Sequence, residues 1–389
     1  MLSIGVVGAG VGGLSVALAL REAGFSDIEV YESGIPGSGS NIGLILTPNA
    51  TRVLHALGLK DRLRALCGLP QAHLQRTWRS GFVLAQRPLG RFAEDRYGAP
   101  HCVIARGDLL RLLLDACRRL GISIQCNRSC TKIHQSGRTV VVELGNQRET
   151  HDVLIGCDGT ESIVRRHLNY PRYSTATRAQ TGWGAAPVTA LPRSMRADVI
   201  TTWLGPGRYF THWLNSTGDH VDFTAFIADD FHPATESAAS VFSSSHADLG
   251  ALIGSSESLE AALVTEHEPT TQWFDRRVVM LGDACHALPP HLQQGAALAI
   301  EDAWVLSRML ERWEDEPMAG FNEYQRYRKV RVTRVRREGQ KSTLQWCLDN
   351  PRQIALRNLK LALASRFLPE IAMQGLDWLY GYDCIKGFE

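Results

Sequence analysis

The chain has 389 residues, and 42 lysines and arginines against 40 aspartates and glutamates leave a formal net charge of +2. With 44% hydrophobic and 21% charged residues, this is the composition of an ordinary globular protein with a sizeable core. The balanced charge gives no indication of a nucleic-acid partner or of an acidic tail, and it favours a small-molecule ligand.

The first residues and the cysteines indicate a cytoplasmic protein. The chain runs directly into a glycine loop and lacks the basic, apolar and small-residue regions of a secretory signal. No apolar run approaches the roughly 20 residues that span a bilayer, so no membrane association is expected. The nine cysteines, an odd number at irregular spacing, are expected to be reduced thiols.

A strand, a helix and a second strand are predicted at the start of the chain. Residues 3–7 form a β-branched run, residues 13–22 have apolar side chains at helical spacing, and residues 28–31 form a short strand. Together they make a βαβ unit, the element on which nucleotide-binding α/β folds are built.

The loop inside this unit contains Gly8, Gly10 and Gly13 at the spacing G-x-G-x-x-G. These glycines permit a tight turn, close approach of a pyrophosphate and close helix packing, while the helix N-terminus attracts phosphate. Glu32, at the end of the second strand, is placed to accept hydrogen bonds from ribose hydroxyls. The pattern predicts a dinucleotide site that FAD and NAD fit equally well.

Further elements follow along the chain. A Gly- and Ser-rich loop occupies residues 34–43, a helix is expected over residues 48–57, and another helix follows Arg106 with Asp108 as its cap. Two short apolar strands, residues 153–156 and 278–281, lead into turns that contain Asp and Gly.

The pattern changes between residues 170 and 268, where aromatic-rich segments alternate in polarity. Such segments are typical of antiparallel strands in a separate sheet, interpreted as a substrate domain inserted into the nucleotide-binding domain. From Glu301 onward the chain is expected to be mainly helical.

The predicted fold class is therefore α/β, a Rossmann-type dinucleotide-binding domain, which a family resemblance makes an FAD-binding domain, with an inserted antiparallel β-sheet substrate domain and C-terminal helices. The expected limits are residues 1–70, 100–170 and 270–330 for the FAD-binding domain, 71–99 and 171–269 for the substrate domain, and 331–389 for the C-terminal helical region.

Three segments decide in favour of FAD, because they resemble one family over almost the whole chain. GAGVGG begins at Gly8, CDGTESIVR at Cys157, and GDACHALPPHLQQGAALAIEDA at Gly282. In these segments the chain resembles the class A, single-component flavoprotein aromatic hydroxylases, which include salicylate, hydroxybenzoate and hydroxynicotinate hydroxylases.

The resemblance implies roles for particular residues. An Asp at the position of Asp283 bonds the ribityl chain of FAD, and the following loop offers backbone amides to the pyrimidine edge of the flavin. Asp158 is expected near the pyrophosphate and the route of NAD(P)H, and Arg106 on the FAD side of the same cleft. The cofactor-binding residues expected in all are Gly8, Gly10, Gly13, Glu32, Arg106, Asp158, Gly159, Gly282, Asp283, Gln293, Gln294, Gly295, Ala296 and Ala297.

The catalytic and substrate-binding candidates are less sharply defined. His291 follows Pro290 in the turn before the flavin loop, where relatives place a catalytic or substrate-contacting residue; the alternative is a histidine that only packs the turn. His212 and Trp213 are neighbours in one predicted strand, so only one of them can face the substrate. Tyr209 and Trp183 are candidates for the cavity wall, with ordinary core packing as the alternative.

The resemblance also implies the reaction. NADH or NADPH reduces FAD, O₂ adds to form the flavin C4a-hydroperoxide, and a small phenolic or N-heteroaromatic substrate is hydroxylated while water is excluded. A same-fold epoxidase or oxidase acting on a larger scaffold, and a non-enzymatic FAD sensor, remain alternatives. Oligomeric state, monomer or homodimer, stays open.

Two departures affect the expected pocket. Hydroxynicotinate hydroxylases, to which the segments RPLGRFAEDRYGAP and DWLYGYD add resemblance, have a histidine where this chain has Ile45. Pro187 stands where many relatives have an arginine. Both changes predict a more apolar pocket.

Two other patterns are interpreted as structural. Cys126, Cys130 and His134 share a spacing of four, but their surroundings indicate strand and loop, so no metal site is predicted. The seven basic residues between Arg326 and Arg337 are interpreted as the solvated face of an amphipathic helix.

Overall fold

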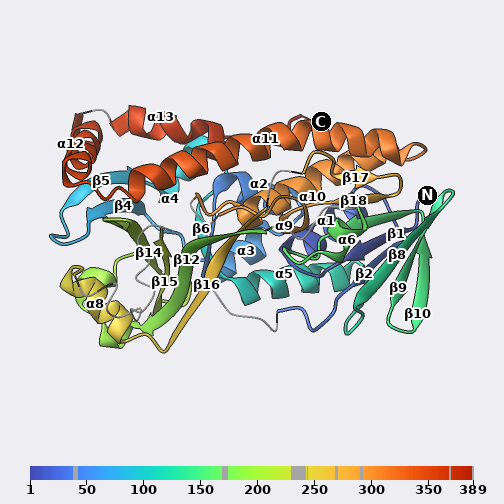
Figure 1. Cartoon of the computed structure of the whole chain (residues 1–389), viewed down its shortest axis with the longest axis horizontal. Coiled ribbons are helices and arrows are strands. Elements are labelled where there is room, and N and C mark those ends of the chain that lie inside the picture. Colours follow the sequence, from blue (N-terminus) through green and yellow to red (C-terminus); the bar gives the residue numbers. More distant parts are fainter. Residues whose placement is uncertain are drawn as a thin grey trace.

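A computed structural model gives the arrangement of residues 1–37, 43–168, 174–228, 242, 244–267, 270–289, 292–367 and 369–387. Figure 1 shows two β-sheet regions side by side, with long C-terminal helices across the top of both. No helix in the described part of the chain is long and apolar enough to cross a membrane.

The first region is built on a six-stranded sheet that begins with the predicted βαβ unit. Its strands β1, β2, β7, β11 and β18 run parallel, and β17 is antiparallel at one edge. In spatial order they are β17 (Phe274–Asp275), β18 (Val278–Met280), β11 (Val153–Gly156), β1 (Ile4–Val7), β2 (Ile28–Tyr31) and β7 (Ser123–Gln125).

Helices and two small sheets complete this region. Helix α1 (Val11–Glu22) packs between α5 (Arg106–Arg119) and α10 (Gly295–Arg312). Asp108 lies in the first turn of α5 and does not cap it, because the helix already begins at Arg106. The remaining elements are β3 (Gly43–Leu46) paired with β6 (Cys102–Ala105), the sheet of β8 (Cys130–Ser136), β9 (Thr139–Leu144) and β10 (Gln147–His151), and helices α2 (Pro48–Ala56), α3 (Lys60–Leu66), α4 (Gly90–Tyr97), α6 (Ile163–His167) and α9 (Asp283–His286).

The second region is a seven-stranded sheet formed by two separate stretches of the chain. In spatial order its strands are β16 (Ser258–His267), β12 (Ser174–Pro187), β15 (His220–Ile227), β14 (Arg208–Leu214), β13 (Val199–Gly205), β4 (Ala72–Thr77) and β5 (Val83–Pro88). Neighbouring strands are antiparallel except β13 and β4, which are parallel. No hairpin joins these two strands, so chain connection does not impose the antiparallel arrangement that was predicted throughout.

The outer face of this sheet is closed by α8 (Ala247–Gly254), with Leu249 and Leu252 packed onto Trp203, Phe210 and Phe223. Two short 3₁₀ helices, Val188–Ala190 and Arg193–Met195, also lie in this part of the chain. The strands fall within residues 71–99 and 171–269, and the exact domain limits stay a prediction.

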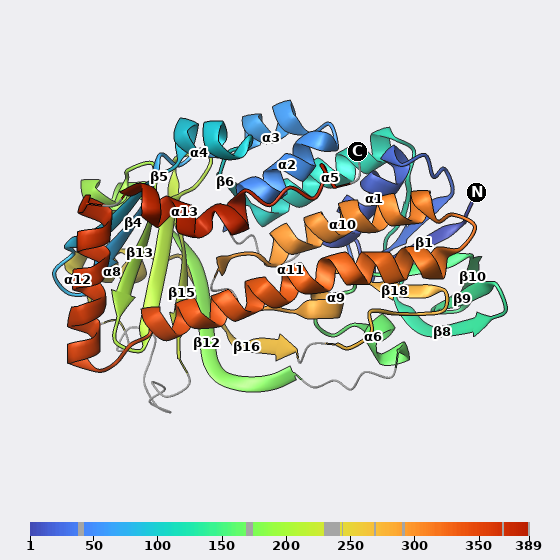
Figure 2. The same ribbon diagram turned by 90° about the horizontal axis from the view of Figure 1, so that it is seen from above.

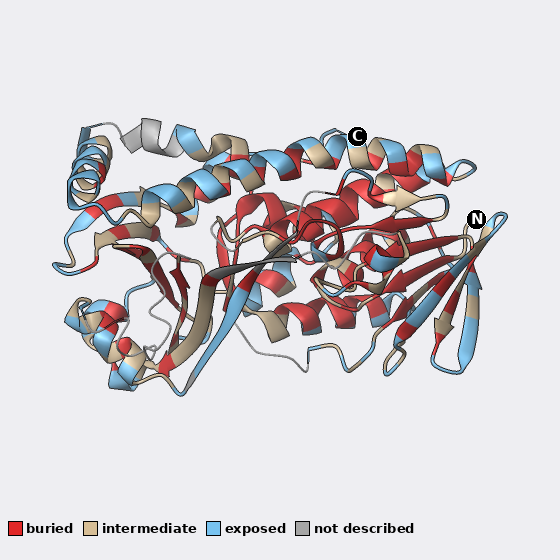
Figure 3. Ribbon diagram, in the orientation of Figure 1, coloured by how far each residue is buried: buried red, intermediate tan, exposed pale blue. Residues whose placement is uncertain are grey.

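The C-terminal helices connect the two regions, as predicted for the residues after Glu301. Helix α11 (Pro317–Trp346) lies along α10 and continues over the seven-stranded sheet (Figure 2). Helices α12 (Pro351–Phe367) and α13 (Pro369–Tyr380) then fold back against β5. Figure 3 shows that buried residues concentrate in the first sheet and its helices, whereas the C-terminal helices expose their outer faces.

A cluster of buried charges joins α10 to α11. Arg328 lies 2.7 Å from a carboxylate oxygen of Glu301 and 2.6 Å from one of Asp302, and all three side chains are fully buried. Arg331 also pairs with Glu301, and His286 lies 2.6 Å from Asp302. Burial opposes ionisation of Asp302, but His286 and Arg328 beside it hold its pKa at about 2.

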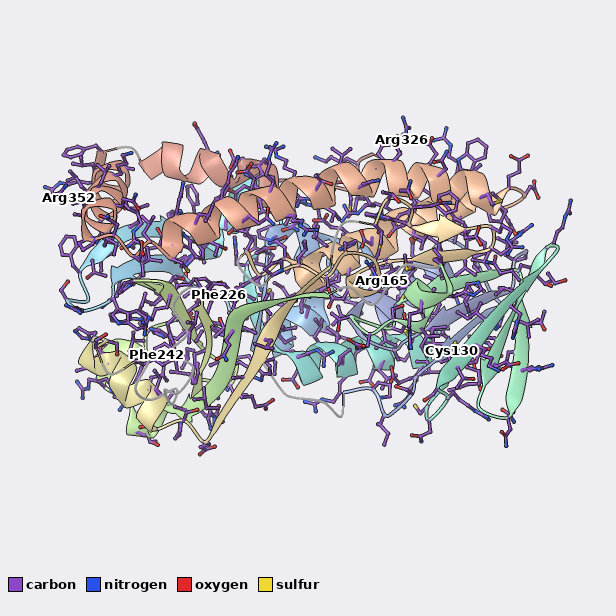
Figure 4. All side chains as sticks on the ribbon, viewed as in Figure 1. Cys130, Arg165, Phe226, Phe242, Arg326 and Arg352 are labelled. Atoms are coloured by element: carbon purple, nitrogen blue, oxygen red, sulfur yellow. The ribbon has the colours of Figure 1, made fainter. Side chains whose placement is uncertain are left out.

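The interpretation of the basic segment as a solvated face is therefore wrong for two of its members. Arg328 and Arg331 point inward to the carboxylates of α10, whereas Arg326, Arg334 and Arg337 are exposed. Figure 4 shows Arg326 on the outer side of α11. The helix thus has one buried cationic stripe and one solvated face.

Replacing Arg328 by Met is expected to lower the free energy of unfolding by about 3–5 kcal/mol, because two buried carboxylates lose their common partner. Arg326→Met on the same helix is the matched control and should change it by less than about 0.5 kcal/mol. Urea unfolding of both variants measures the difference, and equal effects would contradict a buried ion cluster.

Candidate active site

The glycine loop between β1 and α1 leaves open space at one position and is tightly packed at another. A Cβ atom on Gly8, which has φ of +100°, would lie 2.5 Å from the carbonyl oxygen of Cys157. Gly10 has no atom within 4 Å of a Cβ position, and α1 begins immediately after it. The unpaired amides of the first helical turn are thus available at an open surface, where phosphate oxygens bind well.

Glu32 closes this loop from the end of β2. One carboxylate oxygen accepts a hydrogen bond from the amide of Ala9 at 2.8 Å, and the other accepts one from the amide of Gly34 at 3.0 Å. The acid therefore holds the loop in place as well as lining the cavity beside it.

Two adjoining cavities, of about 500 and 250 Å³, extend from this loop toward the other glycine-rich segment. Both are lined by Gly10, Arg106, Cys157 and Gly159, so they form one elongated space. The predicted cofactor residues that line it are Gly8, Gly10, Glu32, Arg106, Asp158, Gly159, Gly282, Asp283, Gly295 and Ala296. An elongated space with a helix N-terminus and an acid at one end fits a dinucleotide.

Asp158 lines this space, but both of its carboxylate oxygens accept hydrogen bonds from neighbouring residues of the chain. One oxygen accepts hydrogen bonds from the amides of Ile163 at 2.7 Å and Val164 at 3.3 Å, and the other accepts one from the Ser162 hydroxyl. Burial raises the pKa of Asp158, and these hydrogen bonds counteract the shift. Its geometry is that of a cap for α6 at the cavity wall.

The far end of the cavity is built by the segments around Asp283 and Gly295. Asp283 is exposed at the first turn of α9, and α10 begins at Gly295. Two hydrogen bonds hold Gln294 just before α10: its amide nitrogen donates to the Thr47 hydroxyl at 3.0 Å, and its amide oxygen accepts from Asn49 at 3.0 Å. Gln294 is therefore buried within the wall, as are Gly13 and Ala297.

A third cavity, of about 170 Å³, lies between the seven-stranded sheet and the C-terminal helices. An apolar cavity of about 150 Å³ is large enough for benzene, so this space has the size of a single ring. It is lined by Ile45, Thr47, His73, Gln75, Arg87, Leu89, His101, Ile200, Thr202, Tyr209, Thr211, Leu292, Gln293, Ser342, Gln345, Trp346, Leu361, Leu376 and Tyr380.

The ring-sized cavity and the elongated cavity share a wall. In β3, Leu44 lines the elongated cavity and its neighbour Ile45 lines the ring-sized one, since successive side chains point to opposite sides of a strand. Within the next loop, Gln293 faces the ring-sized cavity whereas Gly295 lines the elongated one. One strand and one loop therefore separate the two spaces.

Comparison with known proteins agrees with this geometry. The family model described as FAD binding domain matches residues 1–338. The chain belongs to this family. It is 32% identical to a 3-amino-4-hydroxybenzoate 2-monooxygenase of Streptomyces platensis over 98% of this chain and 96% of the relative. It is 31% identical to a 6-hydroxynicotinate 3-monooxygenase of Pseudomonas fluorescens over 89% and 92%.

Solved structures show the same fold. A Klebsiella pneumoniae protein, HpxO, complexed with FAD and uric acid, superimposes with a TM-score of 0.84 at 24% identity over 96% of this chain and 95% of that one. A salicylate hydroxylase substrate complex gives 0.79 at 18% identity over 98% and 96%. The predictions of an FAD-binding protein, of the flavoprotein hydroxylase family and of its fold are confirmed.

In this FAD-binding family member, the predicted substrate residues differ in their position relative to the ring-sized cavity. Tyr209 lines the ring-sized cavity, stacked on Phe226 and edge-on to Trp346. Trp213 is on the same side of β14 but is buried behind the wall in a cluster with Ile45 and Ile200. Trp183 does not line the cavity, and Pro290 and His291 lie outside the described residues.

His212 is on the opposite face of the sheet from the cavity. Thr211 faces the cavity, so alternation sends the neighbouring His212 outward, where it stacks with Trp203. Burial, with Arg76 nearby, lowers the pKa of His212 to about 3. The structure therefore argues against its predicted catalytic role.

Most of the polar side chains that line the ring-sized cavity are not among the residues predicted from the sequence. His73 and Gln75 alternate along β4, Arg87 follows on β5, and His101 and Tyr380 complete the set. Arg87 and Tyr380 belong to RPLGRFAEDRYGAP and DWLYGYD, the two segments noted above only for their resemblance. These polar side chains line the cavity together with Ile45, and a pocket more apolar than that of the relatives stays a prediction.

Asp283→Ala is expected to purify with depleted flavin and to bind added FAD about 10- to 100-fold more weakly, because a carboxylate that lines the elongated cavity is lost. Flavin absorbance relative to protein measures occupancy. Asp315→Ala, which removes an exposed acid just beyond the C-terminal end of α10 and outside the lining of the three cavities, is the control. Full occupancy in Asp283→Ala would remove this residue from the site.

His212→Phe is expected to keep its FAD and its turnover. Because His212 is neutral in the folded protein and has a pKa of about 6.5 when unfolded, it lowers the free energy of unfolding as pH falls below 6.5, by up to about 1.4 kcal/mol per pH unit. Urea unfolding between pH 7 and pH 5 should show a shallower decline in the variant.

Thr211→Val is the matched control for His212→Phe, because its side chain faces the cavity. It should leave that pH dependence unchanged and raise the substrate KM about 2- to 10-fold through the loss of one hydrogen-bonding group. The opposite assignment of the two effects would place His212 in the site.

Proposed function

We propose that this protein is an FAD-dependent monooxygenase that uses NADH or NADPH and O₂ to hydroxylate a small phenolic or N-heteroaromatic ring. The observation that carries the proposal is the shared wall, formed by Leu44 and Ile45 of β3 and by the loop before α10. A ring bound in the ring-sized cavity would lie across this wall from the elongated cavity, which would hold FAD.

The relatives support the reaction type. Those named above are monooxygenases of 3-amino-4-hydroxybenzoate and of 6-hydroxynicotinate. Both compounds are single rings that carry a hydroxyl group, and a cavity of about 170 Å³ suits that size. Both are therefore the first substrates to test.

Bound FAD would accept hydride from the nicotinamide and, once reduced, activate O₂ for transfer of one oxygen atom. The protein would hold the phosphates of FAD at the amides after Gly10 and beside Arg106, and the ribityl chain of FAD at Asp283. The N-terminus of α10 at Gly295 would stabilise negative charge on the reduced ring system.

Polar side chains in the smaller cavity can orient a ring hydroxyl. His73 lies 2.9 Å from the Thr202 hydroxyl, which lies 3.0 Å from that of Thr211. Nδ1 of His101 has no hydrogen-bond partner among the described residues. Because burial lowers the pKa of His101 to about 3, this atom would accept a hydrogen bond without retaining the proton.

The helices that cover this cavity would exclude water. Trp346 of α11, Leu361 of α12 and Tyr380 of α13 line the side away from the sheet. Dry surroundings favour oxygen transfer over release of peroxide. A same-fold oxidase or epoxidase of a larger scaffold is less well supported, because such a compound exceeds the size of this space.

The test is NADH and NADPH oxidation by the FAD-loaded protein under ¹⁸O₂, with 3-amino-4-hydroxybenzoate, 6-hydroxynicotinate, hydroxybenzoates and phenols as candidate substrates. We expect a ring compound to stimulate oxidation and to gain one ¹⁸O atom, measured by mass spectrometry. Stimulation with peroxide as the sole oxygen product indicates an oxidase, and no stimulation by any ring compound contradicts the proposal.

A further inference from the structure

Arg87 occupies an unusual position in the ring-sized cavity. It lies on β5 directly opposite His73 of β4, so both side chains are on the face of the sheet that lines the cavity. Its guanidinium has no hydrogen bond or ion pair with any described residue, and its Nε atom is shielded from solvent without a partner. Desolvation lowers the pKa of Arg87, but a guanidinium stays charged in proteins.

Within the described part of the chain, the lining of the cavity supplies no counter-charge for this guanidinium. Among the described residues that line it there is no Asp, Glu, Lys or second Arg. Burial lowers the pKa values of His73 and His101 to about 3, so both rings are neutral at physiological pH. Tyr380 and Tyr97, whose phenolate charges would act on Arg87, have pKa values raised by burial and are neutral as well.

The buried arginines of α11 provide a contrast within the same chain. Arg328 contacts Glu301 and Asp302, and Arg331 contacts Glu301, so each has a carboxylate of its own. An unpaired cation in a cavity wall is costly, because desolvation is not offset by a partner. The partner that Arg87 lacks is an anion of the size that the cavity admits.

We propose that Arg87 is the receptor for the carboxylate of the substrate, so that the protein acts on single-ring aromatic acids in preference to uncharged phenols. A guanidinium binds a carboxylate through two parallel hydrogen bonds, which fixes the orientation of the ring as well as its charge. The hydroxylation of the bound acid rests on the proposed function, whereas the binding of its carboxylate by Arg87 does not.

The arrangement around Arg87 suits such an acid. The neutral side chains of Gln75 and His73 lie on the same sheet face and supply hydrogen-bonding groups without competing charge. Ile45 and Gln293 line the same cavity at the wall shared with the cofactor space. A ring anchored by its carboxylate at Arg87 therefore stays within the space that adjoins the flavin.

The test compares each acid with its uncharged amide on the FAD-loaded protein by titration calorimetry, which requires no turnover. The pairs are 3-hydroxybenzoate with 3-hydroxybenzamide, 4-hydroxybenzoate with 4-hydroxybenzamide, and 6-hydroxynicotinate with its amide. We expect the unmodified protein to bind at least one acid about 10- to 100-fold more tightly than its amide.

Arg87→Met and Arg87→Gln should retain FAD and lose this preference, to about twofold or less, whereas Arg87→Lys should retain part of it because it keeps the charge. Arg91→Met, which removes an exposed arginine of α4, is the matched control and should keep the full preference. Flavin absorbance and circular dichroism verify that each variant is folded.

Two results overturn the receptor: no preference for any acid in the unmodified protein, or an undiminished preference in Arg87→Met and Arg87→Gln. Equal loss in the Arg91→Met control would also overturn it, because the effect would then not be local. Acid binding through Arg87 without ¹⁸O incorporation would refute the proposed hydroxylation and leave the receptor intact. Hydroxylation without a preference for acids would support the proposed hydroxylation and refute the receptor.

Discussion

Two buried carboxylates on α10 hold together the segments that form both cavities. Asp302 accepts hydrogen bonds from the amide of Gly282 at 3.1 Å and from His286 at 2.6 Å, which fixes the segment that contains Asp283. Glu301 accepts one from Asn49 at 2.6 Å, and Asn49 in turn contacts Gln294. Arg328 and Arg331 neutralise the pair from α11.

Such a cluster is a matter of specificity more than of net stability. The desolvation of several charges largely cancels their attraction, but any arrangement that separates them leaves a buried charge unpaired. The chain therefore has one acceptable position of α11 relative to α10. Because α11 also covers the ring-sized cavity through Gln345 and Trp346, the same cluster sets where that cavity is closed.

Features that depend on neighbouring residues could be predicted from the sequence. The βαβ unit, the glycine spacing and the acid at Glu32 are local, and the structure has β1, α1 and β2 close to the predicted limits. The family resemblance extended this to Asp283 and Gly295, which line the same space as Gly10. Alternation along β14 also showed that His212 and Trp213 face opposite ways, although not which one faces the cavity.

Features that depend on pairing of distant strands could not. The set of His73, Arg87 and Thr202 is formed only when β4 joins β5 on one side and β13 on the other, and no local pattern specifies that register. The partners of Arg328 and Arg331 lie about one helix away in sequence, so a basic run looked solvated. His291 stays a sequence-based prediction.

The two-residue alternation of β3 has an evolutionary consequence. Leu44 lines the elongated cavity and Ile45 lines the ring-sized cavity. Exchange of the side chain at 45 can thus remodel the surface presented to the ring while leaving the flavin side unchanged. Substrate selectivity and cofactor retention can therefore vary independently at two neighbouring residues, so that single substitutions at position 45 can change which ring the fold accepts.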